Sequence, residues 1–411
     1  MTTGELLTQG RAVKSAAAVL AQASDERRQA VLRFVAERLE SSLDELLGVN
    51  EIEVTSYQES GPGRDRLTLT PERIHAMASA LREVAARPDP LFERVDVDVR
   101  PNGLRVERVR VPLGVIGVVY ENRPNVTSDV AGLCVRSGNA AFLRGSSSAL
   151  RTNQFIVSLW HEALEKESLP KDAVSLVEET SHETVVAFMQ LTDVLDCLIP
   201  RGGPSLIRAM REHARVPYVL DGDGNCHVYV DGEANVAMAV AIVKNAKTSR
   251  PGVCNAAETL LVHADVALEL LSQLDFELSD VELRGDERTR ALVSRALEAS
   301  EEDFEREFLD LVLAVKVVDS LDEAIAHVAR YGTGHSEAIV TENPDHAEAW
   351  VRRVDAAAVL VNASTRFIDG GELGLGGEVG ISTQKLHARG PMGLKELTCL
   401  KWVVRGEGQI R

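Results

Sequence analysis

The sequence predicts an α/β protein with two domains, each built on a parallel sheet. After Pro112, short apolar runs alternate with helical patterns, and the expected strands are 114–120, 140–143, 173–177, 194–199, 216–220 and 226–230. A second such series follows position 254, with expected strands at 259–262, 311–318, 338–340 and 357–361. Runs that are apolar on both faces and joined by helices are typical of parallel sheets covered on both sides. Such sheets bind ligands beyond the carboxyl ends of their strands.

The composition agrees with a large enzyme and argues against several classes of partner. With 411 residues, 45% of them hydrophobic and 26% charged, the chain can form two or three domains. Its formal net charge of −18 disfavours nucleic acid and anionic membranes, because both require a basic surface. The five cysteines are scattered without a C-x-x-C pair, which indicates a reducing compartment. We recognise no signal peptide or membrane-spanning run and therefore expect a cytoplasmic protein.

Helices are expected before Pro88, and a hairpin is expected after it. Valines alternate with charged residues over 95–99, Pro101-Asn102-Gly103 supplies the turn, and apolar residues resume beyond it. The alternation changes phase at Glu107-Arg108, which predicts a bulge there. The hairpin is either an ordinary surface ribbon or an element that pairs with another subunit.

One polar segment carries a candidate nucleophile. Residues 244–255 read K-N-A-K-T-S-R-P-G-V-C-N and are expected to form a loop, because Pro251-Gly252 interrupts a continuing helix. Cys254 lies on this loop, and the nearby cations Lys247 and Arg250 favour the reactive thiolate form of its side chain. The alternative is a half-buried loop cysteine that only fills space.

Motifs for other chemistries are absent, and two loops remain as candidate anion sites. The sequence has no G-x-G-x-x-G, P-loop, G-x-S-x-G or H-E-x-x-H motif, and Cys226-His227 is an isolated pair, so we expect no metal. Arg144 and the hydroxyls of Ser146 to Ser148 follow an expected strand, where they can hold a ribose phosphate or form a solvated turn. Gly202-Gly203 opens an expected helix whose N–H groups can face a pyrophosphate, or it makes only a turn.

Six longer motifs carry a family resemblance that covers essentially the whole chain. They are VPLGVIGVVYENRPNVT at 111–127, SGNAAFLRG at 137–145, KTSRPGVCNA at 247–256, AIAHVARYGTGHSEAI at 324–339, VNASTRF at 361–367 and GISTQKLHARGPMGLKEL at 380–397. Together they resemble the glutamate-5-semialdehyde dehydrogenase family, also called the gamma-glutamyl phosphate reductases, of the aldehyde dehydrogenase superfamily.

The resemblance implies an aldehyde dehydrogenase-like fold with two Rossmann-like α/β domains and a small β oligomerisation element. It implies an NADP-binding domain at 1–225, with the hairpin at 93–112 projecting for oligomerisation. A catalytic domain at 226–390 would carry Cys254, and an oligomerisation strand would follow at 391–411.

The resemblance also implies a reaction and its partners. The reaction is the NADPH-dependent reduction of L-glutamate 5-phosphate to L-glutamate 5-semialdehyde and phosphate through a cysteine thioester, the second step of proline biosynthesis. A homo-oligomer, dimer or tetramer, is expected, as is transient contact with glutamate 5-kinase, which makes the substrate. Two alternatives remain open: a CoA-acylating aldehyde dehydrogenase, and a non-catalytic scaffold on the same fold.

By position in the matched motifs, the resemblance assigns roles to individual residues. Cys254 corresponds to the superfamily nucleophile, and Glu307 to a carboxylate that holds the nicotinamide ribose. Arg144 falls where a lysine usually contacts the adenosine ribose, and an arginine there suits the 2′-phosphate of NADP. Asn122 or Asn125 supplies the oxyanion amide, and the alignment does not choose between them.

The substrate carries several charges, so cations are expected to converge on it, and the candidates are Arg123, Arg250, Arg366, Lys385, His387 and Arg389. His327 and His335 are interpreted as structural. Oxidising members of the superfamily carry a glutamate base in an E-L-G-G motif, which aligns here with 220–224. Loss of that base fits a reductase, because a thioester awaiting hydride must not be hydrolysed. Asp221 or Asp223 is the alternative base.

Overall fold

The computed structural model describes residues 2–58, 62–220 and 222–411, and it divides into two compact units. Unit 1 consists of Met1–Asp221, Gly374–Gly380 and Met392–Arg411, and unit 2 consists of Gly222–Leu373 and Ile381–Pro391. The chain therefore builds most of unit 1, continues through unit 2 and returns twice to unit 1. The assignment of cofactor binding to one unit and catalysis to the other stays a prediction.

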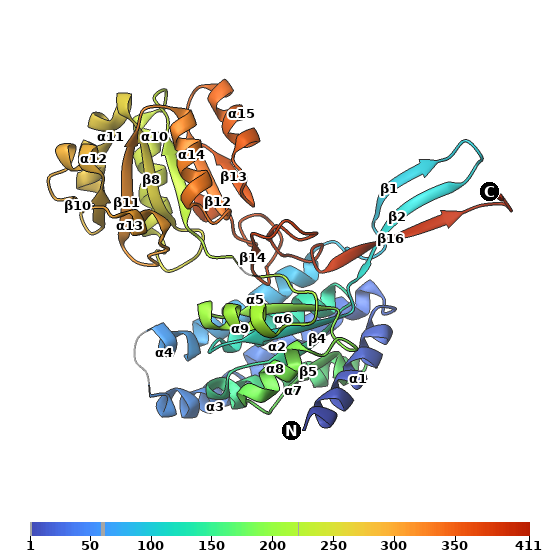
Figure 1. Ribbon diagram of the computed structural model, residues 1–411. Helices are drawn as coiled ribbons and strands as arrows, with labels where there is room; N and C mark the ends of the chain where they lie inside the picture. Colours follow the sequence, from blue (N-terminus) through green and yellow to red (C-terminus); the bar gives the residue numbers. More distant parts are fainter. Residues whose placement is uncertain (1, 59–61, 221) are drawn as a thin grey trace. The chain divides into compact units, whose positions relative to one another are not determined.

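Helices form the N-terminal part of unit 1, as the sequence predicts (Figure 1). They are α1 Thr3–Leu20, α2 Asp25–Ser41, α3 Leu43–Ser56, α4 Pro62–Leu67 and α5 Pro71–Ala86. Ser24 accepts a hydrogen bond from the Arg27 N–H group at the start of α2, and Thr70 caps α5 in the same way. Each cap satisfies a backbone N–H group that the helix itself leaves without an acceptor.

A parallel sheet in the order β5-β4-β3-β6 forms the centre of unit 1. Its strands are β3 Val115–Tyr120, β4 Ala140–Arg144, β5 Val174–Leu176 and β6 Cys197–Arg201. The helices between and after them are α6 Pro124–Arg136, α7 Leu150–Lys166, α8 His182–Met189 and α9 Pro204–His213, with 3-10 turns at Ser147–Ala149 and Lys171–Ala173. Every residue of β3 and β4 is buried, which explains why both runs are apolar on both faces.

The expected strand at 216–220 does not form. Within this run Tyr218 makes an isolated parallel bridge to Leu198. Pro217 has no N–H group to donate and serves only as an acceptor, for the N–H group of Leu198. A proline inside the run removes a rung of the ladder, so the apolar pattern was not sufficient to predict a strand.

Unit 2 contains a larger parallel sheet in the order β10-β9-β11-β8-β7-β12-β13. Its strands are β7 Cys226–Val230, β8 Ala257–His263, β9 Glu282–Gly285, β10 Leu297–Glu298, β11 Val312–Val318, β12 Ser336–Val340 and β13 Ala358–Val361. The helices are α10 Val236–Thr248, α11 Ala264–Glu277, α12 Glu287–Leu292, α13 Glu301–Glu305, α14 Leu321–Tyr331 and α15 Pro344–Arg353, with a 3-10 turn at Thr365–Phe367.

One expectation about this sheet was wrong, and two of its strands were not expected. The run 226–230 was grouped with the first series of strands, but as β7 it pairs with β8 and β12 of unit 2. β9 and β10 were not among the expected strands. These strands have four and two residues, too few to show a periodic pattern.

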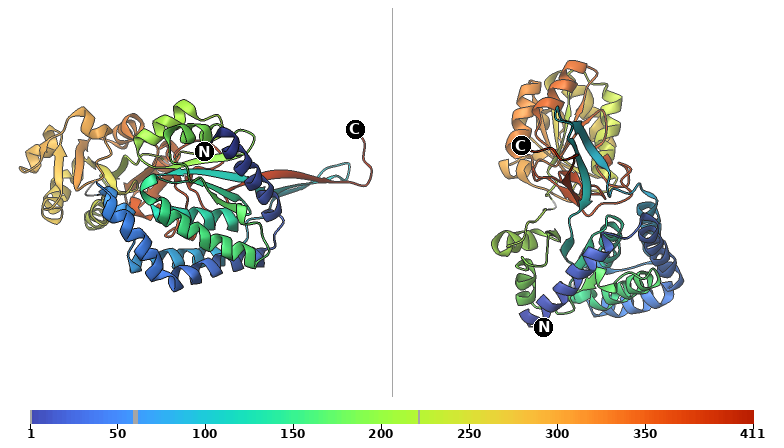
Figure 2. Two further views of the ribbon diagram at one scale, coloured as in Figure 1. Left: turned by 90° about the horizontal axis from the view of Figure 1, so that it is seen from below. Right: turned by 90° about the vertical axis from the view of Figure 1, so that its right-hand side faces the viewer.

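A small antiparallel sheet in unit 1 joins the hairpin to the C-terminal strand (Figures 1 and 2). Its strands are β1 Arg94–Val99, β2 Arg105–Pro112 and β16 Thr398–Arg405, with β2 in the middle. Apolar side chains remain exposed on its outer strands; Val99 and Trp402 are each 65% exposed. In unit 2, β14 Ile381–Ser382 and β15 Gly390–Pro391 form a second short antiparallel pair.

The predicted bulge lies on the other strand of the hairpin. The register shifts between Arg94 and Asp96 of β1, so the extra residue is Val95 rather than a residue of β2. The phase change in β2 has a different cause. Glu107 occupies an inward position beside Val109, is 1% exposed, and forms an ion pair of 2.6 Å with Arg105. A buried carboxylate paired with an arginine thus replaced an apolar residue without disturbing the strand.

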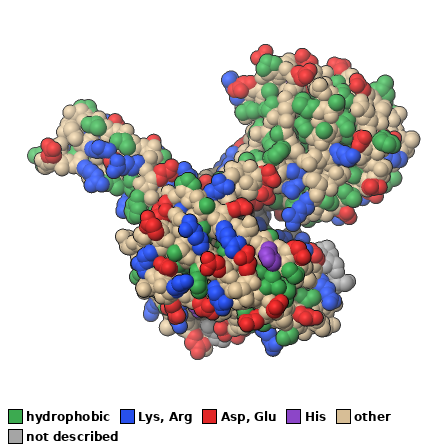
Figure 3. All heavy atoms as spheres, turned by 180° about the vertical axis from the view of Figure 1, so that it is seen from behind, with side chains coloured by type: hydrophobic (Ala, Val, Ile, Leu, Met, Phe, Trp, Pro, Cys, Tyr) green, Lys and Arg blue, Asp and Glu red, His purple; other side chains and the backbone are tan. Residues whose placement is uncertain are grey.

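Acidic and basic side chains are interspersed over the face shown in Figure 3. Among the described residues, no helix combines the length with the apolar composition that crossing a bilayer requires.

One ion pair at the end of β7 predicts a pH-dependent contribution to stability. The buried Asp231 carboxylate accepts hydrogen bonds from Tyr229, Thr341 and the partly exposed His346, whose Nδ1 lies 2.8 Å away. The hydrogen bond to Asp231 raises the pKa of His346 above 6.5. The stabilisation is therefore complete below pH 6.5 and is lost as the pH rises through the raised pKa.

We expect His346→Gln to lower the free energy of unfolding by up to about 1 kcal/mol near pH 5.5, because partly exposed ion pairs are screened by solvent. The difference between variant and wild type should shrink toward pH 9. Urea unfolding at the two pH values measures both quantities. An equal loss at both would show that the charge of His346 does not contribute.

Candidate active site

Cys254 lies on a short loop between α10 and β8, as the sequence predicts. The loop is shorter than expected, because residues 244–248 form the last turns of α10, which ends at Thr248. Lysine and alanine are good helix formers, so the helix continues until it approaches Pro251. The loop therefore places Cys254 just before β8, which is the central strand of the unit 2 sheet.

Burial separates Cys254 from most other cysteines. Cys134, Cys197 and Cys226 are buried, whereas Cys254 is half-buried and Cys399 is exposed on β16. Burial raises the pKa of the three buried thiols, so they remain protonated and unreactive. Cys254 is half-buried on the loop between α10 and β8. This partial exposure is compatible with a nucleophile.

The backbone of Cys254 is held by the segment that leads into β7. The Cys226 thiol donates to the Cys254 carbonyl oxygen at 3.1 Å. At Gly224, an added Cβ would lie 1.6 Å from the same oxygen, so only glycine allows this close approach. The Gly224 N–H group in turn donates to Glu307 Oε1 at 2.9 Å. One short segment therefore connects the Glu307 carboxylate to the backbone of Cys254.

Lys247 is not a cation that faces the thiol. Its side chain is fully buried on α10, and its Nζ lies 2.5 Å from Oε2 of the equally buried Glu258. Glu258 also accepts the Leu309 N–H group at 3.1 Å. Burial lowers the pKa of Lys247 and raises the pKa of Glu258 to about 7. The pair supports the loop from within the core.

Four of the six predicted substrate cations, Arg250, Arg366, Lys385 and Arg389, form two groups in unit 2. Arg366 binds the Asn255 side chain and donates from Nε to Ser249 Oγ at 3.2 Å. Burial lowers the pKa of Arg366, and the charge of Arg250 lowers it further, while Cys254 acts in the opposite direction. Two arginines and the nucleophile candidate are thus within electrostatic reach of one another.

The other group surrounds Asp355, to which Lys385 and Arg389 both form ion pairs. The hydrogen bond from Lys385 and then that from Arg389 lower the pKa of Asp355. His387 is exposed between β14 and β15, and Arg123 is the N-cap residue of α6 in unit 1. A role in substrate binding stays a prediction for all six cations.

The two candidate oxyanion donors have different surroundings in unit 1. Asn122 follows β3; its Nδ2 donates to the Tyr57 hydroxyl at 2.7 Å, and its Oδ1 accepts from Ser148 Oγ at 2.6 Å. Asn125 is on α6, and its Nδ2 donates to Asp129 Oδ2 at 2.9 Å. Burial raises the pKa of Asp129 to about 6.

The surroundings of Arg144 favour a phosphate contact, whereas those of Gly202 and Gly203 disfavour one. Arg144 is 8% exposed and donates to the carbonyl oxygens of Gly145, Thr180 and Ser181. Its Nε is buried and has no hydrogen-bond partner among the described residues, which leaves one donor for an anion. At the start of α9, a Cβ on Gly202 would lie 2.8 Å from a carboxylate oxygen of Glu121. That negative charge disfavours a pyrophosphate against Gly202 and Gly203.

The histidines that we interpreted as structural are buried. His327 packs edge-on against His227 and Phe304, and burial lowers its pKa to about 3. His227 Nδ1 lies 2.9 Å from the buried Glu337 carboxylate, and His335 is also buried. Within the described residues, no group of three or more histidine, cysteine or acidic side chains is arranged to hold a metal ion.

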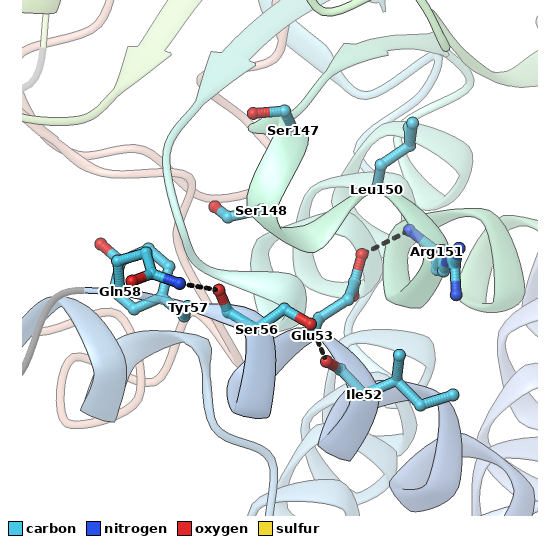
Figure 4. A pocket seen from close by; sticks show the side chains of 9 residues that line it. All are labelled: Ile52, Glu53, Ser56, Tyr57, Gln58, Ser147, Ser148, Leu150 and Arg151. Carbon is cyan, nitrogen blue, oxygen red and sulfur yellow. Dashed lines mark hydrogen bonds between the residues drawn. The ribbon is translucent and has the colours of Figure 1, made fainter.

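Unit 1 contains a pocket of about 520 Å³ (Figure 4), and its lining includes Tyr57 and Ser148, the two hydrogen-bond partners of Asn122. It is lined by α3 and the start of α7, through Ile52, Glu53, Ser56, Tyr57, Gln58, Ser147, Ser148, Leu150 and Arg151. Glu53 accepts the N–H groups of Arg151 and Thr152 and so caps α7. Sequence patterns did not indicate Tyr57, Gly224 or Cys226 as site residues, because their contacts join segments far apart in the chain.

The whole chain is similar to known enzymes. A model of the aldehyde dehydrogenase family matches residues 8–293 and 292–403. Gamma-glutamyl phosphate reductases from Clostridium perfringens and Moorella thermoacetica are 50% and 51% identical over 412 residues, covering 99% of this chain and 99% of each relative. The crystal structure of gamma-glutamyl phosphate reductase from Thermotoga maritima has a TM-score of 0.96 and 46% identity, covering 99% of this chain and 100% of that one.

A more distant structure, an acetylating aldehyde dehydrogenase from Geobacillus thermoglucosidasius, is 18% identical with a TM-score of 0.70 and covers 100% of this chain and 98% of that one, which shows the shared fold. The predicted family and the predicted aldehyde dehydrogenase fold are therefore confirmed. This chain belongs to the gamma-glutamyl phosphate reductases, oxidoreductases of the aldehyde dehydrogenase family.

Proposed function

We propose that this enzyme reduces L-glutamate 5-phosphate to L-glutamate 5-semialdehyde and phosphate with NADPH, through a thioester on Cys254, in proline biosynthesis. The observation that carries the proposal is identity of about half the residues, over the full length, to proteins named for this reductase activity. The surroundings of Cys254 support it, because Arg250 and Arg366 supply the cations that an anionic substrate requires.

In the proposed reaction, the Cys254 thiolate attacks the acyl carbonyl carbon of the substrate. A C–S bond forms, the C–O bond to phosphate breaks, and phosphate leaves with the bonding electron pair. The charge that develops on the carbonyl oxygen is stabilised by an asparagine carboxamide and by the Cys254 N–H group. One such donor is typically worth about 3 kcal/mol. Phosphate is a good leaving group, so the step requires little help from a general acid.

When bound, NADPH would supply a hydride to the thioester carbon. The C–S bond would then break with its electron pair returning to the Cys254 sulfur as thiolate, and the aldehyde would leave. The chain's contribution is to orient the reacting groups and to exclude a base. Of the two aspartates that could replace the missing glutamate base, Asp223 is exposed, and Asp221 lies outside the described residues. The proposal requires neither, because activating a water molecule would divert the thioester to hydrolysis.

The residues present fit the cofactor in part. Glu307 is anchored by the Gly224 N–H group beside the Cys254 loop, where a carboxylate can hold ribose hydroxyls. In unit 1, Arg144 offers its buried Nε–H, and Ser146 a hydroxyl, at the carboxyl end of β4. We therefore propose these residues for the cofactor and retain Gly202 and Gly203 only as weaker contacts, since Glu121 lies against the first of them.

We also propose that subunits pair through β1, β2 and β16. Val97, Val404 and Trp402 are 51%, 57% and 65% exposed, and burial of such side chains would favour association. Size-exclusion chromatography with light scattering should show a dimer or tetramer.

The reverse reaction tests the function. L-glutamate 5-semialdehyde, phosphate and NADP should yield NADPH, and the rate should depend on phosphate, because phosphate must attack the thioester to complete the cycle. CoA in place of phosphate should give no turnover. Turnover with CoA would favour a CoA-acylating enzyme, and NADPH formation without either acceptor would indicate hydrolysis and contradict the acyl-phosphate assignment.

A further inference from the structure

Both ends of the Asn122 carboxamide are held by hydroxyl groups from other segments of unit 1. Tyr57, which directly follows α3, accepts a hydrogen bond from Nδ2 at 2.7 Å. Ser148, between β4 and α7, donates to Oδ1 at 2.6 Å. We call Tyr57 and Ser148 the carboxamide clamp.

Ser148 also connects Asn122 to a third hydroxyl group. Ser146 Oγ lies 2.7 Å from Ser148 Oγ, and either of these two hydroxyls can be the donor. The Ser146 oxygen also accepts the Ser148 N–H group at 3.3 Å, which holds the turn in place. A chain of hydroxyl groups thus reaches Asn122 from the turn after β4.

These two contacts hold both polar ends of the carboxamide. Asn122 Nδ2 points to the Tyr57 hydroxyl, and its Oδ1 points to the Ser148 hydroxyl. Nδ2 carries two hydrogens, and Tyr57 accepts only one of them. The second hydrogen keeps a defined direction, and a donor with a fixed direction is what stabilises a developing oxyanion.

Asn125 lacks these features. Its Nδ2 donates to the carboxyl group of Asp129 on the same helix. A negative charge on Asp129 would compete with an oxyanion for the same carboxamide, and the pKa of Asp129, raised by burial to about 6, leaves it mostly ionised at neutral pH. Electrostatics therefore disfavours Asn125 as an oxyanion donor.

We propose that Tyr57 and Ser148 are positioning residues that orient the Asn122 carboxamide as the oxyanion donor, in preference to Asn125. This inference rests on the proposed acyl-phosphate function. Both clamp residues also line the pocket of about 520 Å³ (Figure 4), together with Ser147. The clamp therefore joins the turn after β4, where we place cofactor contacts, to the group that stabilises the reacting carbonyl.

The test compares kcat and KM of Tyr57→Phe, Ser148→Ala and Asn122→Ala in the reverse assay with semialdehyde, phosphate and NADP. Each clamp variant should lower kcat about tenfold or more while leaving KM for NADP within about twofold, since a misplaced catalytic group can cost about 100-fold. Ser148→Thr retains the hydroxyl and should restore most of the rate. Ser158→Ala, which removes a hydroxyl bond of 2.7 Å from the exposed face of α7, is the matched control.

A double-variant cycle shows whether the clamp acts through Asn122. In the Asn122→Ala background, Tyr57→Phe and Ser148→Ala should add little further loss. Equal losses in both backgrounds, or a larger loss in Asn125→Ala than in Asn122→Ala, would overturn the inference. If wild type and Tyr57→Phe turn over phosphate and semialdehyde equally well, the clamp is wrong while the proposed function stands. The melting temperatures of Ser148→Ala and Ser158→Ala are compared as well. If both variants lose the same stability and the same activity, the effect of Ser148→Ala is merely structural.

Discussion

Replacing Cys254 by alanine is expected to lower kcat on the order of 10⁶-fold, the scale found when a catalytic nucleophile is removed. Alanine cannot form the thioester, and the buried thiols have raised pKa values that keep them unreactive. Folding should be unaffected, because Cys254 is half-buried and its backbone carbonyl still accepts from Cys226. NADPH binding should also stay near that of wild type.

Mass spectrometry checks this expectation directly. Wild-type enzyme incubated with L-glutamate 5-phosphate, without cofactor, should acquire one glutamyl group on the peptide that contains Cys254. Cys399→Ala is the matched control, because this cysteine is exposed on β16 and should be dispensable for acylation. Acylation that persists in Cys254→Ala, or rapid hydride transfer in that variant, would mean that another residue is the nucleophile.

The largest effect on stability is expected from Lys247→Met. The change leaves Glu258 fully buried without its partner, and breaking a buried pair in this way typically costs about 3–5 kcal/mol. Burial already raises the pKa of Glu258 to about 7, and loss of the lysine should raise it further. The folded variant must then keep a proton that the unfolded chain releases above pH 4.5, so its stability should fall as the pH rises.

Urea unfolding at pH 5.5 and pH 8.5 measures the loss and its pH dependence. Lys244→Met on the same helix is the control, since its ion pair with Glu277 is solvent-exposed and should be worth at most about 1 kcal/mol. The double variant Lys247→Met/Glu258→Leu should recover most of the stability, because two apolar residues can replace a buried pair. A single variant as stable as Lys244→Met would show that Glu258 finds another partner or water.

The elements that could be predicted from sequence are those whose pattern follows from burial. β3 and β4 are buried on both faces and therefore appear as continuous apolar runs, and the helices before Pro88 carry recognisable caps. The errors also have physical causes. Pro217 breaks the ladder of an otherwise apolar run, and Glu107 occupies a core position because arginines surround it.

The sequence predicted individual residues of the candidate site, but not the contacts between them. The motifs placed Cys254 on a loop beside Arg250, and the structure shows both on the loop between α10 and β8. Lys247 was expected near the thiol, but its charge is compensated by Glu258. The contacts of Cys226 with Cys254, and of Tyr57 with Asn122, depend on tertiary packing, so no local pattern could have indicated them.

The position of β16 in the chain has a consequence during biosynthesis. β2 pairs with β1 on one side and with β16 on the other, and β16 follows all of unit 2 in the chain. On the ribosome, β2 therefore presents an unpaired edge while unit 2 is being made, and such edges are templates for aggregation. A chain that terminates before Thr398 would keep the β2 edge exposed permanently. In a finished chain β16 covers this edge, so only finished chains lose this template for aggregation.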